Sequence, residues 1–406
     1  MSWKHVLLSS AAALTLVVML SACSRKPETL DQMIDRGLKV ASAQALDMAK
    51  QLENQPAAFP RTVDGDTLQT SDYTWWCSGF FPGELWYLYE ATGKETFRHY
   101  AEIYTKRVAP AQFMTNTHDV GFMIYNSFGN AYRITKDTSY CSAIINAANS
   151  LSTRYNVKAG VFKSWDSNSK WQYPVIIDNM MNLELLCEAY KINGDQDLYA
   201  KALSHASTTL VYQFRPTFSC YHVIDYDTIT GRPRAFDTAQ GYSRESAWAR
   251  GQSWALYGFT MMYRESGKED YLTAARNVAF FLMNHPRMPQ DKVPYWDYDA
   301  PDIPNAKRDA SSAAIMASAL IELSQVNNMF PVENDGYLKF AEAQLRSLSS
   351  PQYLAKKGEN HHFTLMHSVG SLPGKSEVDV PLSYADYYYV EALLRLKKVL
   401  KEQPSK

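Results

Sequence analysis

Stretches with helical periodicity dominate this sequence, and strand patterns are scarce. The expected helices cover residues 29–53, 80–91, 95–108, 120–134, 138–154, 179–192, 196–213, 249–265, 269–284, 310–325, 336–348 and 384–401. They alternate in character along the chain, which limits the folds that the chain can adopt. The sequence predicts an all-α protein.

Every second helix, from the third onward, begins in the same way. The openings read GKETFRHYA, KDTSYCSAI, GDQDLYAKA, GKEDYLTAA and NDGYLKFAE. Each has a polar turn, an acidic residue that suits the positive end of the helix dipole, and an aromatic residue soon after. Each helix then continues as amphipathic, with one face for solvent. These repeated openings indicate a helical-hairpin unit whose outer member faces water.

The intervening helices are apolar nearly all round. Their openings read WWCSGFFPGELW, HDVGFMIYNSFG, IIDNMMNLELL, ESAWARGQSWALYG, RDASSAAIMASAL and PLSYADYYYVEALL. A helix that is hydrophobic on every side belongs in the interior. Six outer helices that alternate with six inner ones predict an (α/α)6 barrel, a toroid of six hairpins.

In such a barrel the inner helices run roughly parallel, so their N-termini meet at one mouth. This arrangement gathers polar and aromatic residues that are distant in the sequence, namely Trp76, His118, Asp119, Asp178, Trp248, Arg250, Asp309 and Asp386. Helix N-termini also favour anionic ligands at that mouth.

The N-terminal segment reads as an export signal. After Lys4 and His5, residues 6–20 form an uncharged apolar run that is too short to span a bilayer. Small residues then precede Cys23, as in a bacterial lipobox. We expect residues 1–22 to be a lipoprotein signal peptide and Cys23 to be lipidated; the alternative is an ordinary signal peptide with an incidental cysteine. The prediction is an exported, lipid-anchored protein that faces the periplasm and touches the membrane only through that anchor.

Residues 23–406 contain no Pro/Gly/Ser-rich linker, so we expect one catalytic barrel domain. The formal net charge of −1 gives no electrostatic reason to expect nucleic acid as a partner. There is no phosphate loop, and the His, Cys and carboxylate spacing builds no metal site, so no cofactor or metal is expected. The remaining cysteines are far apart and are expected to be buried free thiols, although an exported protein can form disulfides: Cys77, Cys141, Cys187 and Cys220.

Two carboxylates open neighbouring inner helices. Asp178 lies in VIIDNMMNLELL, residues 175–186, and Asp119 lies in HDVGF. Either residue can be a helix N-cap. Asp178 follows three apolar residues, which can raise a carboxyl pKa and leave a proton available for catalysis. Paired carboxylates are typical of glycosidic acid/base chemistry. Our hypothesis is that Asp178 both caps its helix and supplies a proton.

Several motifs, taken together in order and spacing, resemble the unsaturated glucuronyl hydrolases of glycoside hydrolase family 88. They are HDVGF at 118–122, IIDNMM at 176–181, YH at 221–222, QGYSRESAWARGQ at 240–252, WDYDAPDIPNAKRDASSAAI at 296–315 and PLSYADYYYVEALLRL at 381–396. The resemblance covers nearly the whole chain from about residue 30. The family fold is the (α/α)6 barrel, in agreement with the helix pattern.

The resemblance implies an unusual reaction. Family members act on oligosaccharides made by polysaccharide lyases, whose terminal uronic acid carries a C4=C5 double bond, and they hydrate that bond. Asp178 matches the family's proton donor, and Asp119 matches the second aspartate, which hydrogen-bonds sugar hydroxyls. One carboxyl that acts as acid and then as base needs a pKa near the working pH.

Substrate contacts are implied residue by residue. Trp76, Trp165 and Trp248 match aromatics that stack on sugar rings, and His222 and Gln240 match positions near the reacting atoms. Arg250 is the expected partner of the uronate carboxylate; the alternative is a structural ion pair with a barrel carboxylate.

The loop HSVGSLPGKSEVDVPLSY, residues 367–384, matches a family region that can contact sulfate. Ser368, Lys375 and Ser376 are the candidates there, and the alternative is a solvated surface loop.

Three other functions fit parts of the sequence. A family 105 relative, an unsaturated rhamnogalacturonyl hydrolase, shares the fold and the chemistry but acts on pectin fragments. A non-catalytic sugar-binding lipoprotein would keep the tryptophans without needing the carboxylates. An inverting hydrolase of saturated glycans would need an acid and a base far enough apart to admit water.

Overall fold

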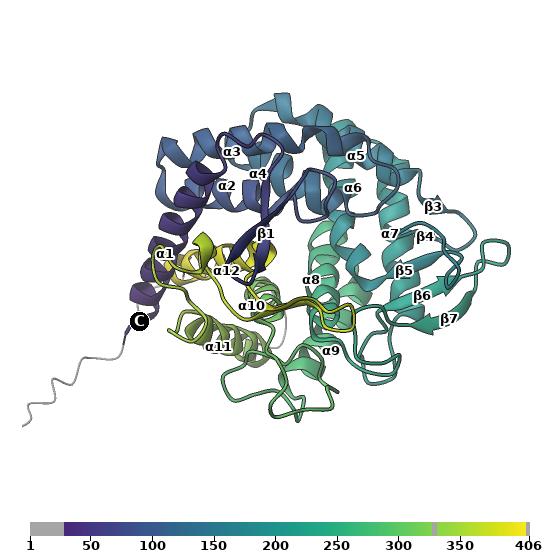
Figure 1. Ribbon diagram of the computed structural model, residues 1–406. Coiled ribbons are helices and arrows are strands. Elements are labelled where there is room, and N and C mark those ends of the chain that lie inside the picture. Colours follow the sequence, from purple (N-terminus) through teal and green to yellow (C-terminus); the bar gives the residue numbers. More distant parts are fainter. Residues whose placement is uncertain (1–27, 327–330, 403–406) are drawn as a thin grey trace, which may run out of the picture.

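The computed structural model describes residues 28–326 and 331–402, and these residues form a ring of helical hairpins (Figure 1). The outer helices are α1 (Leu30–Gln51), α3 (Glu95–Val108), α5 (Cys141–Ser152), α7 (Gln196–Tyr212), α9 (Glu269–Met283) and α11 (Pro331–Leu348). The inner helices are α2 (Phe80–Thr92), α4 (Asn130–Thr135), α6 (Leu183–Asn193), α8 (Ala249–Ser266), α10 (Ala310–Ser324) and α12 (Ser383–Glu402). The predicted six-hairpin toroid is confirmed.

Two inner helices begin with irregular turns that the periodicity did not predict. α4 is preceded by a π-helix, Gly121–Gly129, and α6 by a 3-10 turn, Ile177–Asn182. The Asn182 side-chain oxygen accepts a hydrogen bond from the Phe122 backbone N–H at 2.8 Å. This bond supplies a partner for one of the first N–H groups of the helix, which have none within the helix itself.

α11 begins at Pro331, five residues before the expected start at 336. Proline is well suited to the first turn of a helix because its missing N–H is not needed there.

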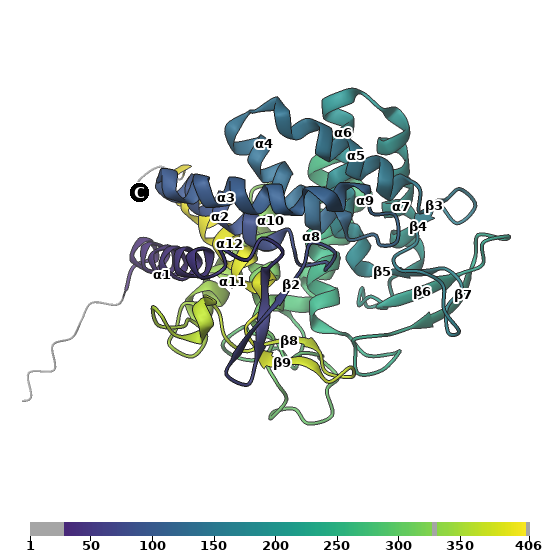
Figure 2. The same ribbon diagram turned by 45° about the horizontal axis from the view of Figure 1, so that its top comes forward.

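Short antiparallel strands form four small sheets that the sequence pattern did not reveal. They pair β1 (Phe59–Asp64) with β2 (Thr67–Ser71), β3 (Tyr155–Asn156) with β4 (Val161–Phe162), β5 (Pro174–Ile176) with β6 (Val223–Tyr226) and β7 (Pro233–Asp237), and β8 (Ser368–Ser371) with β9 (Ser376–Val380). The hairpins β1–β2 and β8–β9 and the β5–β7 sheet lie toward one end of the toroid (Figures 1 and 2). That end is where the inner helices begin.

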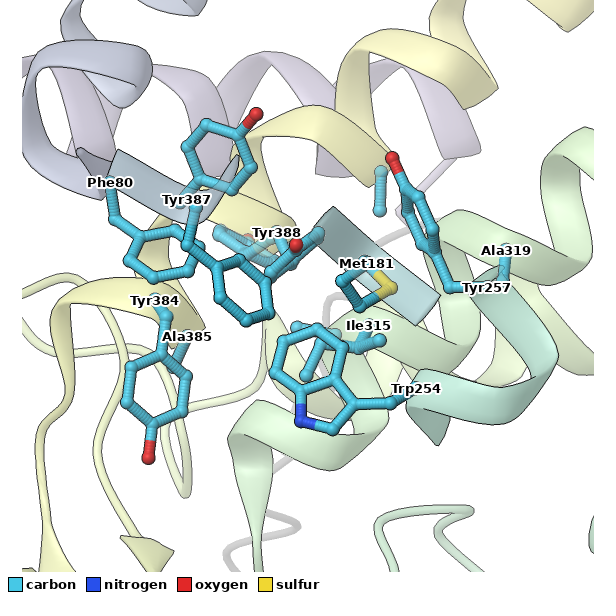
Figure 3. Close-up of a cluster of buried hydrophobic side chains, with 14 of the residues drawn as sticks. Phe80, Met181, Trp254, Tyr257, Ile315, Ala319, Tyr384, Ala385, Tyr387 and Tyr388 are labelled. Carbon is cyan, nitrogen blue, oxygen red and sulfur yellow. The ribbon is translucent and has the colours of Figure 1, made fainter. Parts of the chain in front are cut away.

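The centre of the toroid is filled with aromatic side chains (Figure 3). Phe80 and Tyr384 have ring centroids 5.8 Å apart, and Trp254 and Tyr388 have centroids 5.4 Å apart. These rings belong to one continuous apolar cluster that runs from α1 to α12. The packed rings separate the two mouths of the barrel, so a ligand at one mouth does not reach the other.

The structure tests the prediction of buried free thiols, but it does not test the predicted lipid anchor at Cys23. All four cysteines of the described ranges carry free thiols; Cys77, Cys187 and Cys220 are buried, and Cys141 is half-buried because it begins the outer helix α5. Within the same ranges, no helix combines the length and apolar character that a membrane span requires. Cys23 and the predicted signal peptide lie outside the described residues.

Candidate active site

Asp178 lies in the turn that joins β5 to α6, beside His222. β5 pairs with β6, with Ile176 opposite Val223, and this pairing brings the two segments together. Asp178 Oδ2 lies 3.8 Å from His222 Nε2, and the Asp178 residue is 7% exposed. The predicted capping role of Asp178 is wrong. The turn begins one residue earlier, its N-cap is Ile176, and no side chain caps it.

Burial raises the pKa of the Asp178 carboxyl to about 7. The positive charge of Arg250 opposes this rise, and the negative charge of Asp119 adds to it. Oδ2 is buried without a hydrogen-bond partner among the described residues. A carboxyl that is half protonated at neutral pH, with one free oxygen, can both donate and accept a proton.

His222 is neutral and its tautomer follows from its contacts. The backbone N–H groups of Ala239 and Gln240 both donate to Nδ1, each at 3.1 Å. Nδ1 is therefore an acceptor, and the proton lies on Nε2, facing Asp178. Burial, reinforced by the charge of Arg250, lowers the pKa of His222 to about 3. A neutral Nε2–H donor beside Asp178 can hold a water molecule or a sugar oxygen.

Two of the three predicted stacking tryptophans lie against His222. The Trp248 ring centroid is 4.4 Å from that of His222, and the Trp165 centroid is 6.4 Å away in an edge-on arrangement. Trp165 is half-buried and also contacts Trp171, at 5.5 Å. Trp248 is buried at the start of α8. The partly open face of Trp165 is the one suited to a sugar ring.

Asp119 is held by a chain of side chains that fixes its hydrogen-bond partner. Asn182 accepts from the Phe122 N–H, so its amide nitrogen faces His118 Nδ1 at 3.3 Å. His118 Nε2 then carries the proton and lies 3.2 Å from Asp119 Oδ1. Thr117 donates its hydroxyl to Oδ2 at 2.6 Å. Asp119 is thus oriented as an acceptor at the mouth, with its side chain 21% exposed.

We expect Asn182→Asp to disturb Asp119 through His118. The substitution keeps the shape and the acceptor for Phe122, but it replaces the donor to His118 Nδ1 with an acceptor. At neutral pH the single proton of His118 then moves to Nδ1 to meet this acceptor, so Nε2 no longer donates to Asp119. The new negative charge also raises the pKa of His118, which burial now lowers. We expect kcat/KM to fall about tenfold, the loss of one hydrogen bond of about 1.4 kcal/mol. Steady-state kinetics and an NMR titration of His118 check this prediction. An unchanged kcat/KM together with an unchanged pKa of His118 would contradict the proposed hydrogen-bond chain from Asn182 through His118 to Asp119.

Arg250 is buried and makes its contacts inside the protein. Its terminal nitrogens donate to the backbone carbonyls of Val369 and of Gly370, the latter at 2.7 Å, and one of them lies 3.4 Å from Asp309 Oδ2. Nε has no partner among the described residues. Its guanidinium also lies over the Trp248 ring, 4.6 Å from the centroid. The structural ion pair that was the alternative is present, and the contact with a uronate carboxylate stays a prediction.

Gln240 and Trp76, two further predicted substrate contacts, are linked to Arg250 through strand β8 and through Tyr384. Gln240 donates to the Gly370 carbonyl at 3.1 Å, the same oxygen that Arg250 binds. The half-buried Trp76 ring lies 4.8 Å from Tyr384. Arg250 lies 5.3 Å from the Tyr384 ring. The structure therefore brings most of the predicted site residues into one cluster.

The three candidates for sulfate contact are separated by the structure. Ser368 is buried, and its hydroxyl accepts from the Ser311 N–H at 3.2 Å, so it supports the start of α10. Lys375 is exposed at the turn of the β8–β9 hairpin, and Ser376 is half-buried. Of the three, Lys375 has the freedom to reach a substrate.

Two further aspartates placed at the mouth by sequence have structural partners. Asp309 caps α10, because its side chain accepts from the Ser311 N–H at 3.1 Å. Asp386 is buried and accepts from the backbone N–H groups of Thr364 and Leu365 at 2.7 and 2.8 Å. Asp386 thus holds a loop in place, whereas Asp309 also touches the cluster through its ion pair with Arg250.

Three residues of this cluster were missed by sequence reasoning. Tyr384 connects Trp76 with Arg250, Asn182 fixes His118, and the Trp254 indole N–H lies close enough to Asp178 to moderate the rise of its pKa. Tyr384 and Asn182 lie in or beside the quoted motifs. Their aromatic and amide side chains at inner-helix openings were the available signal.

A cavity of about 1000 Å³ opens at the opposite mouth, where the inner helices end. Its lining includes neither Asp119 nor Asp178. Its charges are paired with one another, as Arg264 is with Glu184 and Arg395 is with Glu391 at 3.2 Å. The two aspartates predicted for catalysis therefore lie away from this cavity, at the N-terminal mouth.

Comparison with known proteins decides between the candidate families. Residues 48–394 match the model of Glycosyl Hydrolase Family 88. The chain belongs to glycoside hydrolase family 88. It is 47% identical over 327 residues, 80% of each chain, to an unsaturated glucuronyl hydrolase of Formosa agariphila.

Two other relatives agree. The chain is 33% identical over 376 residues to an unsaturated chondroitin disaccharide hydrolase of Streptococcus pneumoniae, covering 91% of this chain and 92% of the relative. The crystal structure of an unsaturated glucuronyl hydrolase specific for heparin superimposes with a TM-score of 0.88 at 45% identity, covering 91% of this chain and 98% of that one.

The activity follows from this membership. The family 88 enzyme removes the terminal unsaturated glucuronic acid from an oligosaccharide. Its substrate is an unsaturated oligosaccharide. The matches favour this activity over the family 105 relative, the binding lipoprotein and the hydrolase of saturated glycans.

Proposed function

We propose that Asp178 carries out the hydration of the substrate double bond as both acid and base. The observation that supports this role is its buried carboxyl, with a pKa near 7 and a free Oδ2 facing the Nε2–H of His222. The protonated carboxyl gives its proton to C4, and positive charge develops at C5, stabilised by the ring oxygen. Water then forms a bond to C5 and returns a proton to Asp178. The resulting hemiketal opens and the remaining sugar leaves.

Other residues of the cluster position the substrate in this scheme. Asp119, oriented by His118, accepts hydrogen bonds from sugar hydroxyls, and His222 Nε2–H holds the attacking water or a sugar oxygen. The half-buried faces of Trp76 and Trp165 stack on the sugar rings. Arg250, buried against Trp248, offsets the negative charge of the uronate.

A panel of unsaturated disaccharides tests this function. Lyase products of chondroitin, hyaluronan, heparin and pectin are incubated with the protein that lacks its signal peptide, and the loss of the ultraviolet absorbance of the conjugated double bond is followed. We expect turnover of the glucuronyl substrates. Activity on the pectin fragment alone would instead place the enzyme with the family 105 activity.

The parent polymer is proposed to be a sulfated glycosaminoglycan. The names of two relatives support this choice, since one acts on a chondroitin disaccharide and the other is specific for heparin. The ranking of kcat/KM across the same panel identifies the polymer.

We expect kcat/KM to fall above about pH 7, by about tenfold for each further pH unit, because the acid must be protonated. The pKa of Asp178, raised by burial to about 7, sets this limb of the profile. The pH dependence of kcat/KM on one disaccharide measures it. A rate that stays constant from pH 7 to pH 9 argues against Asp178 as the acid.

We further propose that Cys23 carries a lipid and that the enzyme is anchored facing the periplasm. The apolar run at 6–20, followed by small residues and a cysteine, supports this location. We expect the full-length protein to fractionate with membranes and Cys23→Ser to be soluble or uncleaved. Equal membrane association of both forms would count against the anchor.

A further inference from the structure

Two hairpins from opposite ends of the chain lie together at the mouth that holds Asp119 and Asp178 (Figure 2). β1 packs on β9, and the contact includes an ion pair in which Arg61 Nε lies 2.5 Å from Glu377 Oε1. The Arg61 side chain is 27% exposed and that of Glu377 is 11% exposed. The hairpins thus form a charged wall at the rim.

The Arg61 guanidinium is held in place, but some of its hydrogen-bond donors have no partner among the described residues. It lies over the indole of Trp75, with its central carbon 4.0 Å from the ring centroid. Within the described part of the chain, its hydrogen bond to Glu377 uses Nε alone. Both terminal nitrogens therefore remain available, and they form the planar pair of donors that suits an oxyanion.

The wall is joined to the substrate cluster through Gly370. The Glu377 side chain packs against the Cα of Gly370, where no Cβ fits. The carbonyl of Gly370 accepts from both Arg250 and Gln240. Arg61 is therefore connected, through Glu377 and Gly370, to Arg250 and Gln240, which are predicted to surround the unsaturated sugar.

The charges around Cys77 give a second measure of this closeness. Burial raises the pKa of the Cys77 thiol, Glu377 and Asp119 add to the rise, and Arg61 and Arg250 oppose it. The Cys77 thiol is therefore close enough to feel the charge of Arg61 and also the charges of Asp119 and Arg250 at the mouth. Trp75 is also adjacent in sequence to Trp76, a predicted stacking residue.

We propose that Arg61, supported by Trp75 and Glu377, binds a sulfate group on the sugar that the enzyme releases. The inference rests on the proposed function, because the unsaturated sugar must lie at Asp178 for the next sugar to reach the rim. The fork of terminal nitrogens binds two sulfate oxygens, and the indole keeps the fork in place. Glu377 neutralises part of the charge, so the selectivity for sulfate is moderate.

Paired disaccharides that differ only in one sulfate on the hexosamine test this proposal. We expect Arg61→Gln to raise KM for the sulfated substrate about tenfold, with a much smaller change for the unsulfated one. Arg98→Gln is the matched control, because Arg98 also binds a carboxylate through Nε, that of Glu102 at 3.0 Å, but lies on the outer helix α3. It should leave both substrates unaffected.

Glu377→Gln distinguishes sulfate binding by Arg61 from a purely structural role of the Arg61–Glu377 ion pair in the hairpins. It keeps the shape of the side chain but removes the charge that competes with sulfate, so KM for the sulfated substrate should fall about twofold or more. Parallel losses for Arg61→Gln and Glu377→Gln on both substrates would overturn the proposal, as would no effect of Arg61→Gln. Wild-type turnover of unsulfated substrates alone also overturns it, whereas no turnover of any unsaturated substrate refutes the proposed function itself.

Discussion

Asp178→Asn is expected to lower kcat by about 10³-fold while substrate still binds. General acid–base catalysis contributes roughly 10² to 10⁴ in rate, and here one group serves both steps. The amide keeps the shape of the carboxyl but has no proton to give to C4 at neutral pH. The ultraviolet assay gives kcat, and equilibrium binding of a disaccharide gives the affinity. Activity within tenfold of the wild type would contradict the assignment.

The thermal stability of Asp178→Asn shows whether the variant is folded and therefore controls for misfolding. Burial raises the pKa of Asp178 to about 7 in the folded protein, above the value of about 3.9 for an unfolded aspartate. The folded state therefore binds this proton more tightly, and the contribution of the carboxyl to stability falls as pH rises from about 4 to about 7. Asp178→Asn removes that loss, so its thermal midpoint near pH 8 should equal or exceed that of the wild type. A lower midpoint would point to misfolding as the cause of inactivity.

Gly79→Ala is expected to destabilise the fold by about 3 kcal/mol or more. Gly79 precedes α2, and a Cβ there would lie 2.2 Å from the backbone carbonyl oxygens of Phe122 and Met123. Neither oxygen can move without displacing the π-helix that follows Asp119, and overpacking of a rigid interior costs 1–3 kcal/mol or more. We expect the thermal midpoint to fall by roughly 5–10 °C, as measured by circular dichroism.

Gly336→Ala is the matched control for this substitution. Gly336 lies in the outer helix α11, and no atom lies within 4 Å of the position its Cβ would take. Alanine is favoured over glycine in a helix by about 1 kcal/mol, so this variant should be slightly more stable. Similar midpoints for Gly79→Ala and Gly336→Ala would show that the close approach of α2 to the π-helix is not tight.

The toroid was predictable because its signal is repeated. Inner helices that are apolar on all sides, such as α10 with its run of buried alanines and serines, have no stable place except the interior. The sequence also located Asp119, Asp178, Trp248 and Arg250 at one mouth, since parallel inner helices leave no other arrangement.

The finer geometry of the site was not predictable, because it depends on pairing between distant segments. β5 has three residues, and its register against β6 decides that Asp178 faces His222 and does not cap a helix. Nothing in the local pattern around Arg250 shows that Val369 and Gly370 accept its hydrogen bonds. Contacts of this kind are fixed by tertiary packing, which short-range periodicity does not encode.

The position of Arg61 was likewise not predictable from the sequence. Its partner Glu377 is more than three hundred positions away, and both lie in short strands with weak sequence signals. Glu377 adopts a positive φ of 56°, as residues at irregular hairpins do. The wall that we assign to sulfate recognition therefore becomes visible only when the two hairpins are seen together.

The most direct test of the mechanism is to run the reaction in heavy water and to locate deuterium in the released uronic acid by NMR. Proton transfer from Asp178 to C4 predicts deuterium on a single face of C4 in the first product formed, abolished in Asp178→Asn. Direct attack on the glycosidic carbon would release an enol that tautomerises in solution and takes deuterium on both faces of C4, and the account would be wrong.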